Sequence, residues 1–319
     1  MYHVLSAHQF DRIQLDQLFR MADIMEYNAK NGGTNLLQGK IMAALFFEPS
    51  TRTRFSFESA MMRLSGSVIS TENATQFSSA IKGETLEDSI RVISSYADVI
   101  VLRHNEEGAA KRAAQVAGVP VINAGDGSGE HPTQSLLDLY TIQKELGAID
   151  GLKVAMVGDL TYGRTVHSLS YMLAKYEKVT VYFVSPENCP IPEKVKAYLD
   201  ERGVTYFEET DLEKVSGEVD VLYMTRIQKE RFPSGEEYLK AAGKYVINQE
   251  IVDGMKPNAI ILHPLPRAGE ILPEVDGDAR AAYFRQATNG VYIRMALLAY
   301  CLKEQQLERD LEALAEVLK

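Results

Sequence analysis

Short apolar runs alternate with longer amphipathic segments along this chain, and this alternation limits how it can fold. The apolar runs are rich in Val and Ile and mostly lack alternating polar residues. We therefore expect strands that are covered on both faces, as in a parallel sheet. Helical patterns lie between many of these runs, as where Phe57, Ala60, Met61 and Leu64 recur at the spacing of one helix face. The pattern predicts an α/β fold with right-handed crossovers.

The predicted strands form two groups. They are Lys40–Phe47, Ser67–Ser70, Val99–Leu102 and Pro120–Asn123, then Lys153–Val157, Val179–Val184, Val204–Phe207, Val219–Met224 and Ala259–Leu262. A helix stop and a turn at Gly147–Gly151 separate the groups. With 319 residues, the chain is long enough for two domains at roughly 100–200 residues each.

We therefore predict two doubly wound domains with parallel sheets. The first comprises residues 1–146 plus 284–319, and the second comprises residues 147–283. A helix over Pro132–Leu146 is expected to bridge the domains. A C-terminal helix, predicted over Ala281–Gln306, is expected to return to the first domain.

Composition excludes several classes of protein. The formal charge of −10, from 34 Lys+Arg against 44 Asp+Glu, argues against partners such as nucleic acid or an anionic membrane. Apolar runs are shorter than the roughly 20 residues of a membrane helix, and no export signal is visible. Two cysteines are too few for a disulfide framework or a zinc cage. We expect a cytoplasmic protein with no metal and no cofactor.

Polar residues follow the predicted strands of the first half, where doubly wound sheets bind ligands. Ser50, Thr51, Arg52 and Thr53 open a helix after the first strand, and such a helix start suits a phosphate group. Arg103 follows the third strand. A capped helix and a surface ion pair are the structural alternatives for these two positions.

A glycine-rich segment follows the fourth predicted strand and leads to His131 and Gln134 at a helix entrance. The helix dipole disfavours a charged imidazole there, so a neutral His131 is expected to donate to a developing oxyanion. A structural histidine in a helix cap is the competing interpretation.

The second half offers further binding groups after its strands. The segment Gly158–Thr165 lacks the G-x-G-x-x-G fingerprint of dinucleotide sites, which disfavours a dehydrogenase. Arg164 lies at a helix start and Arg226 follows another strand, while His263–Arg267 forms a proline-rich turn with carbonyls that can accept from an amide. With Arg52, Arg103 and His131, these cations predict one anionic ligand per domain.

Four motifs resemble the aspartate and ornithine carbamoyltransferase family. Phe47–Arg54 is similar to its carbamoyl-phosphate motif and His131–Gln134 to its second motif. The motifs Arg226–Arg231 and His263–Arg267 are similar to the aspartate branch, whereas the His-Cys-Leu-Pro turn and Ser-Met-Gly segment of the ornithine branch are absent. The resemblance covers nearly the whole chain, in the family's order.

The resemblance implies transfer of the carbamoyl group from carbamoyl phosphate to L-aspartate, giving N-carbamoyl-L-aspartate and phosphate in de novo pyrimidine biosynthesis. It implies a set of residues for carbamoyl phosphate: Ser50, Thr51, Arg52, Thr53, Ser78, Arg103, His131, Gln134, Leu265 and Pro266. Four of these would be catalytic: Arg52, Thr53, Arg103 and His131. The residues implied for aspartate are Lys82, Arg164, Arg226 and Gln228.

The resemblance also implies an assembly. Ser78 and Lys82 would come from a neighbouring subunit, so that a homotrimer shares its active sites. It leaves open a separate regulatory chain, and it implies domain closure, for which we predict a Glu48–Arg164 ion pair. Two alternatives remain, an ornithine-type carbamoyltransferase and a non-catalytic anion-binding protein on the same fold, although Arg164 and Arg226 favour a dicarboxylate over a diamino acid.

Overall fold

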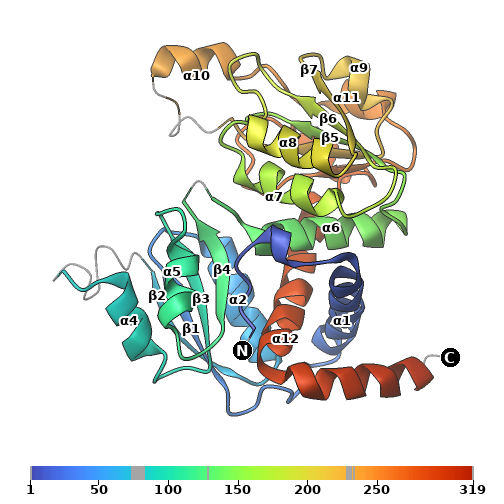
Figure 1. Ribbon diagram of the computed structural model, residues 1–319. Coiled ribbons are helices and arrows are strands. Elements are labelled where there is room, and N and C mark those ends of the chain that lie inside the picture. The colour runs from blue at the N-terminus through green and yellow to red at the C-terminus, as the bar shows by residue number, and fades with distance from the viewer. Residues whose placement is uncertain (1, 73–82, 128, 228–231, 233, 318–319) are drawn as a thin grey trace. The chain divides into compact units, whose positions relative to one another are not determined.

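The chain folds as two compact units. The computed structural model describes residues 2–72, 83–127, 129–227, 232 and 234–317. Unit 1 comprises Met1–Thr133 and Asn289–Lys319, and unit 2 comprises Gln134–Thr288. The chain passes between the units within helix α6 and again within helix α12 (Figure 1).

Strands and helices alternate along both units. The elements up to the first crossing are η1 (Ala7–Gln9), α1 (Arg12–Lys30), β1 (Ile41–Phe46), α2 (Thr51–Arg63), β2 (Ser67–Glu72), α4 (Leu86–Ile93), β3 (Val99–His104), α5 (Ala109–Val116), β4 (Val121–Asp126) and α6 (Pro132–Leu146). Those that follow are β5 (Lys153–Val157), α7 (Arg164–Leu173), β6 (Thr180–Val184), α8 (Glu193–Glu201), β7 (Thr205–Glu209), α9 (Glu213–Ser216), β8 (Val221–Met224), α10 (Gly235–Ala241), α11 (Gln249–Gly254), β9 (Ile260–Leu262), η4 (Pro273–Gly277) and α12 (Tyr283–Val317).

Both sheets are parallel throughout, which confirms the predicted fold class. Sheet A of unit 1 has the strand order β2-β1-β3-β4, and sheet B of unit 2 has the order β7-β6-β5-β8-β9. All the predicted strands are present: β5 has the predicted bounds, and the others have shifted ends. Strand β3 runs on through Arg103 and His104, because His104 continues the pairing with Asp126 of β4.

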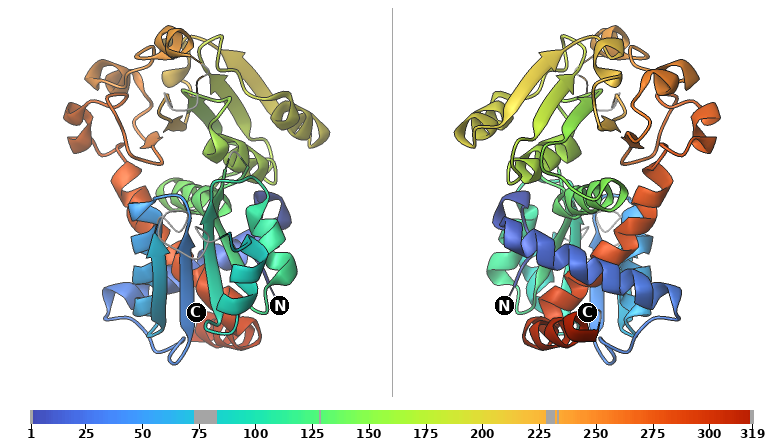
Figure 2. Two further views of the ribbon diagram at one scale, coloured as in Figure 1. Left: turned by 90° about the vertical axis from the view of Figure 1, so that its left-hand side faces the viewer. Right: turned by 90° about the vertical axis from the view of Figure 1, so that its right-hand side faces the viewer.

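Helices cover both faces of sheet A. On one face, α4 and α5 pack through an apolar cluster that includes Leu45, Ile90, Ile100, Leu102 and Ala113. Helices α1, α2 and α12 lie on the other face (Figures 1 and 2). Burial on both sides explains why β3 consists of buried residues from end to end.

Sheet B is covered in the same way. Leu222 and Met224 of β8 join a core cluster with residues of α9 and α11, such as Val215 and Val252. The side chain between them, Tyr223, points to the opposite face, because successive side chains of a strand alternate. Helices α7 and α8 lie on that face.

Both crossings between the units lie within long helices. Helix α12 returns to unit 1, where the Arg294 guanidinium lies 5.1 Å from the centroid of the Phe57 ring. Helix α6 belongs to unit 2 from Gln134 onward, because its Asp138 hydrogen-bonds Tyr223 and Gln286 of that unit. The compact units divide after Thr133, at the start of α6, and the predicted domain boundary after residue 146 stays a prediction.

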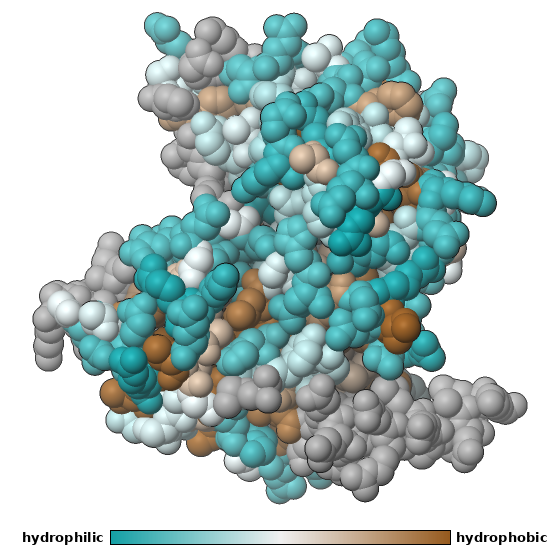
Figure 3. Space-filling view, viewed as in Figure 1, coloured by the Kyte–Doolittle hydropathy of each residue, from teal (hydrophilic) through white to brown (hydrophobic). Residues whose placement is uncertain are grey.

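The outer surface is mostly hydrophilic on the face that Figure 3 shows, with apolar residues in separate patches. Large exposed apolar side chains include Ile13, Phe55, Met62 and Tyr96 in unit 1. In the described part of the chain, every helix is too short or too polar to cross a membrane.

Candidate active site

Strands β1 and β3 of sheet A mark the point where the strand order reverses. From there the sheet continues to β2 on one side and to β4 on the other. The loops that leave the carboxyl ends of two such strands diverge, and ligands of open α/β sheets bind in the crevice between them. Residues 50–53 follow β1 and Arg103 is the next-to-last residue of β3, so the predicted phosphate-binding residues flank this point.

The start of α2 is built to receive an anion. Ser50 is the N-cap residue, and its side chain makes no capping hydrogen bond. The first backbone N–H groups of a helix have no acceptor within the helix, so they point at a ligand. Thr53 is buried in this turn, whereas Arg52 is exposed. Nearby protein atoms displace some of the water around the Arg52 guanidinium, which lowers its pKa, but the group stays charged at neutral pH.

Arg103 is held between two loops. It is 9% exposed, with Nη2 3.1 Å from Oε2 of Glu48 and Nη1 donating to the carbonyl oxygen of Ala124 at 3.4 Å. Glu48 comes from the loop after β1 and Ala124 from β4. The guanidinium is thus fixed at the sheet edge. The Glu48–Arg164 pair stays a prediction.

The loop after β4 places His131 at the entrance of α6. Asp126 stabilises this loop, because it accepts hydrogen bonds from the backbone N–H groups of Gly108 and Glu130 at 3.0 and 3.1 Å. His131 is 5% exposed, and its Nδ1 lies 3.5 Å from Oγ1 of Thr133. His131 therefore sits at the same sheet edge as Arg103, within reach of the loops that follow neighbouring strands.

Unit 2 repeats this plan at strands β5 and β8, where its strand order reverses. Arg164 is the first residue of α7, which follows β5, and Arg226 follows β8. Gly158 lets the two loops approach each other: its φ is +121°, and a Cβ there would lie 2.4 Å from the carbonyl oxygen of Thr225. The half-buried Arg164 and Arg226 therefore emerge from tightly packed, adjacent loops.

The turn after β9 brings backbone groups to the same edge of sheet B. Leu265 has a φ of +52°, which leucine seldom adopts. Its N–H donates to Nδ1 of His263 at 2.7 Å, and Nε2 of His263 donates to Glu270 at 2.7 Å. Leu265 and Pro266 thus lie on a turn whose shape is set by buried hydrogen bonds. The predicted site residues Ser78, Lys82 and Gln228 lie outside the described residues.

Sequence reasoning missed the residues that hold the site in place. Asp138, Glu270 and Gln286 are buried or half-buried partners of predicted site residues or of the turn after β9. Asp138 did carry a signal, since it is a charged residue within the apolar stretch Leu136–Tyr140. No sequence pattern marked Glu270 or Gln286, because only the folded chain brings these residues to His263.

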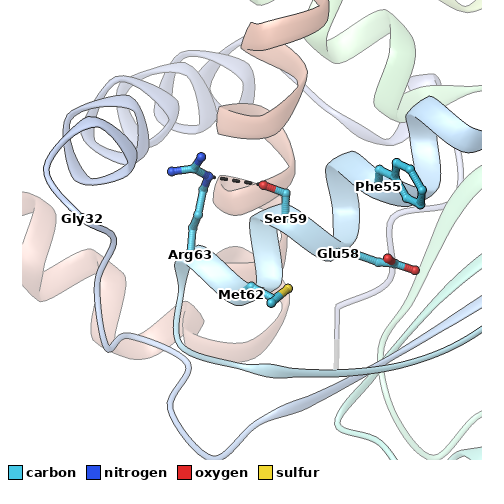
Figure 4. A pocket seen from close by; sticks show the side chains of 6 residues that line it. All are labelled: Gly32, Phe55, Glu58, Ser59, Met62 and Arg63. Atoms are coloured by element: carbon cyan, nitrogen blue, oxygen red, sulfur yellow. Dashed lines mark hydrogen bonds between the residues drawn. The ribbon is translucent and has the colours of Figure 1, made fainter.

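A hollow on unit 1 lies away from the predicted site residues. It has a volume of about 450 Å³ and runs along the outer side of α2 (Figure 4). Its lining is Gly32, Phe55, Glu58, Ser59, Met62 and Arg63. The hollow is wide open, and the ligand chemistry of unit 1 lies instead at the strand ends. In the described part of the chain, His, Cys, Asp and Glu form no group of three or more suited to a metal ion.

Comparison with known proteins agrees with this geometry. Residues 2–144 match the carbamoyl-P binding domain of the aspartate/ornithine carbamoyltransferases, and residues 150–301 match their Asp/Orn binding domain. Aspartate carbamoyltransferase 3 of pea, a chloroplastic protein, is 57% identical over 303 residues, which cover 94% of this chain and 77% of the pea protein.

Solved structures show the same fold. The catalytic subunit of M. jannaschii aspartate transcarbamoylase is 49% identical, with a TM-score of 0.89 over 96% of this chain and 99% of that one. The Trypanosoma cruzi enzyme in complex with carbamoyl phosphate and aspartate is 43% identical, with a TM-score of 0.89 over 94% of this chain and 96% of that one. This chain belongs to the aspartate/ornithine carbamoyltransferase family.

Proposed function

We infer that this protein transfers the carbamoyl group of carbamoyl phosphate to the amine of L-aspartate, giving N-carbamoyl-L-aspartate and phosphate. The observation that carries this function is the placing of arginines at the reversal point of each sheet. Arg52 and Arg103 suit a phosphorylated ligand in unit 1, and Arg164 and Arg226 suit two carboxylates in unit 2. The relatives named for aspartate support the same acceptor.

We assign the binding of carbamoyl phosphate to unit 1, and the binding of its NH₂ group to α6 and the turn after β9. The α2 start, residues 50–53, holds the phosphate through hydroxyls, backbone N–H groups and Arg52. Thr53, Arg103 and His131 polarise the carbonyl oxygen. The side chain of Gln134 and the backbone of Leu265 and Pro266 receive the carbamoyl NH₂.

The chemistry needs a neutral amine and a stabilised oxyanion. The aspartate nitrogen attacks the carbonyl carbon and gives a tetrahedral intermediate, whose negative oxygen is stabilised by Arg103 and His131. The bond from carbon to the phosphate oxygen then breaks, and the departing phosphate accepts the proton that the nitrogen loses. Arg164, Arg226 and Gln228 hold the acceptor's carboxylates, so that much of the rate comes from positioning.

We also propose that the protein works as a homotrimer with shared sites, in the cytoplasm and in de novo pyrimidine biosynthesis. Ser78 and Lys82 would then complete a neighbour's site. Support for self-association comes from Phe55 and Met62, which are 53% and 67% exposed beside the hollow on α2 (Figure 4). Exposed apolar side chains grouped in this way are typical of a contact surface.

An acceptor assay tests the proposed reaction. The purified protein is incubated with carbamoyl phosphate and either L-aspartate or L-ornithine, and both phosphate and the carbamoylated product are measured. We expect N-carbamoyl-L-aspartate and phosphate in equal amounts, and no product from ornithine. Product from ornithine alone would make the protein an ornithine-type enzyme. Tight phosphate binding without product from either acceptor would favour a non-catalytic anion-binding protein.

A further inference from the structure

Asp138 is a charged residue in the interior of unit 2. It lies in α6, one turn after Gln134, and is fully buried. A carboxylate removed from water is costly unless hydrogen-bond donors surround it. The identity of those donors therefore shows what Asp138 is tied to.

Side chains from separate elements donate to this carboxylate. Nε2 of Gln134 and Nε2 of Gln286 both donate to Oδ1, at 2.8 and 2.6 Å. The hydroxyl of Tyr223 donates to Oδ2 at 2.7 Å. Burial, and then the negative charge of Asp138, raise the pKa of Tyr223 well above its ordinary value, so Tyr223 keeps its proton and acts as the donor.

This arrangement fixes the direction of both glutamine amides. Oε1 of Gln286 accepts the backbone N–H of His263 at 2.8 Å, so Nε2 is the end that faces Asp138. A reversed Gln134 would bring its own oxygen against Oδ1, acceptor against acceptor. Gln134 therefore keeps Nε2 on Asp138, and Oε1 is the end of its amide that can accept from a ligand.

A second series of hydrogen bonds leads from Asp138 to the turn after β9. Gln286 holds the backbone of His263, and the His263 ring accepts the N–H of Leu265 while donating to Glu270. The oxygen atoms of Glu270 also accept the N–H of Ala268, at 2.8 Å. Asp138 is thus linked, through Gln286 and His263, to the backbone assigned to the carbamoyl NH₂.

We propose that Asp138 is a positioning residue that makes the site selective for an NH₂ group on the transferred carbonyl. It turns the acceptor end of Gln134 toward that group and is tied to the Leu265 turn. A carbamoyl group can donate two hydrogen bonds to these acceptors, whereas an acetyl group carries a methyl in the same place and can donate none. This inference rests on the proposed function, since it assigns a cause to the choice of carbamoyl phosphate.

The test compares carbamoyl phosphate with acetyl phosphate in the full-length protein. The KM for carbamoyl phosphate and the inhibition constant for acetyl phosphate are measured for the wild type and for Asp138→Leu. Leucine has the branching of aspartate but no acceptor, so Gln134 is released. We expect the KM to rise about tenfold while the inhibition constant changes less than about twofold. A purely structural fault would weaken both ligands together.

Two further variants serve as matched controls. Asp138→Asn keeps an oxygen for both glutamines, while the Tyr223 hydroxyl can rotate to accept from its NH₂, so we expect both constants within about threefold of wild type. Tyr223→Phe removes the donor on Oδ2 and leaves Oδ1 untouched, so the ratio of the two constants is expected to stay unchanged. If Asp138→Leu lacks a cooperative thermal transition, Asp138→Ala takes its place with the same expected ratio.

The outcomes distinguish a failure of the role proposed for Asp138 from a failure of the proposed function. A folded Asp138→Leu or Asp138→Ala protein with the wild-type ratio of constants would overturn the role of Asp138 and leave the proposed function intact. A wild-type protein that forms no N-carbamoyl-L-aspartate would overturn the proposed function itself, whatever the variants do.

Discussion

Arg103 is held by Glu48 and by the Ala124 carbonyl oxygen. A cation fixed in this way needs little rearrangement when charge develops on a neighbouring oxygen, and such preorganisation is a major source of rate enhancement. His131 is buried at the same sheet edge. At the scale of single residues, we therefore expect binding and oxyanion stabilisation to be separable between Arg52 and His131.

We predict that His131→Ala lowers kcat about 100- to 1000-fold, because loss of one oxyanion donor costs about 2.7–4 kcal/mol in the transition state. The inhibition constant for inorganic phosphate should change less than about threefold, because phosphate has no carbonyl for His131 to contact. Steady-state kinetics with phosphate as inhibitor measures both quantities.

Arg52→Ala is the matched comparison, since it removes a cation from the phosphate side of the site. We expect it to raise the phosphate inhibition constant by a larger factor than His131→Ala does. Equal losses of turnover and phosphate affinity in both variants would contradict the separate roles and would favour a simple anion-binding surface.

At the scale of elements, an arginine that is ion-paired within the segment before α12 also hydrogen-bonds the backbone of α11. Arg280 donates to both carboxylate oxygens of Asp278, at 2.9 and 2.8 Å, and to the carbonyl oxygen of Val252 at 2.7 Å. The hydrogen bonds from Arg280 lower the pKa of Asp278 to about 2, although its burial opposes this. Both side chains are less than one-fifth exposed, at 16% and 17%.

We predict that Asp278→Asn lowers the free energy of unfolding by about 1–2 kcal/mol at pH 7, because a full shift of the pKa from 3.8 to about 2 corresponds to at most ~2.4 kcal/mol. A lowered carboxyl pKa stabilises the fold above the unfolded value of 3.8, and this contribution is lost as the pH falls through about 2. Urea unfolding at a series of pH values should show the wild-type advantage shrinking between about pH 4 and pH 2.

Asp211→Asn provides the control within the same unit. Asp211 is 44% exposed and lies 3.8 Å from Lys214, which is 72% exposed. Such a surface pair contributes little, so we expect a change below about 0.5 kcal/mol. An equal loss of unfolding free energy in both variants would show that the Asp278–Arg280 pair stabilises the fold no more than an exposed surface pair does.

The sequence predicts which strands and helices are present more closely than it predicts where each one ends or which residues it contacts. Runs of Val and other apolar residues predict inner strands such as β3 and β5, because these strands are buried on both faces, whereas the edge strands β2 and β7 are mostly exposed. The extension of β3 to His104 depends on pairing with Asp126 of β4, which no local pattern records. The hydrogen bonds of Asp138 in α6 likewise join it to Tyr223 and Gln286, which are distant along the chain.

The candidate site was predictable where a ligand group lies near the carboxyl end of a strand, as Arg103 does in β3 and Arg164 does at the start of α7. Parallel strands bring their carboxyl ends to one edge, so the order of strands and loops suffices to group these residues. The order of strands and loops does not predict how a side chain in the site is oriented. The direction of Gln134 depends on Asp138 and Gln286, and only the folded chain brings that network together.

At the scale of the whole molecule, the proposed shared sites make activity depend on association between copies of the chain. The outer side of α2 exposes Phe55 and Met62 next to an open hollow. We predict that Met62→Glu converts a trimer into single chains. Burying methionine contributes about 1.5–3 kcal/mol, and a buried unpaired carboxylate costs more, so association should weaken roughly 100-fold or more. Light scattering after size-exclusion chromatography measures the mass.

Activity must fall together with mass if Ser78 and Lys82 serve a neighbour's site. Ile13→Glu is the matched control, because Ile13 is as exposed as Met62, at 67%, but lies in α1 and not in the lining of the hollow. We expect Ile13→Glu to keep both mass and activity. A Met62→Glu protein that is a single chain with full activity would refute the shared site, and one that remains trimeric would place the contact on another surface.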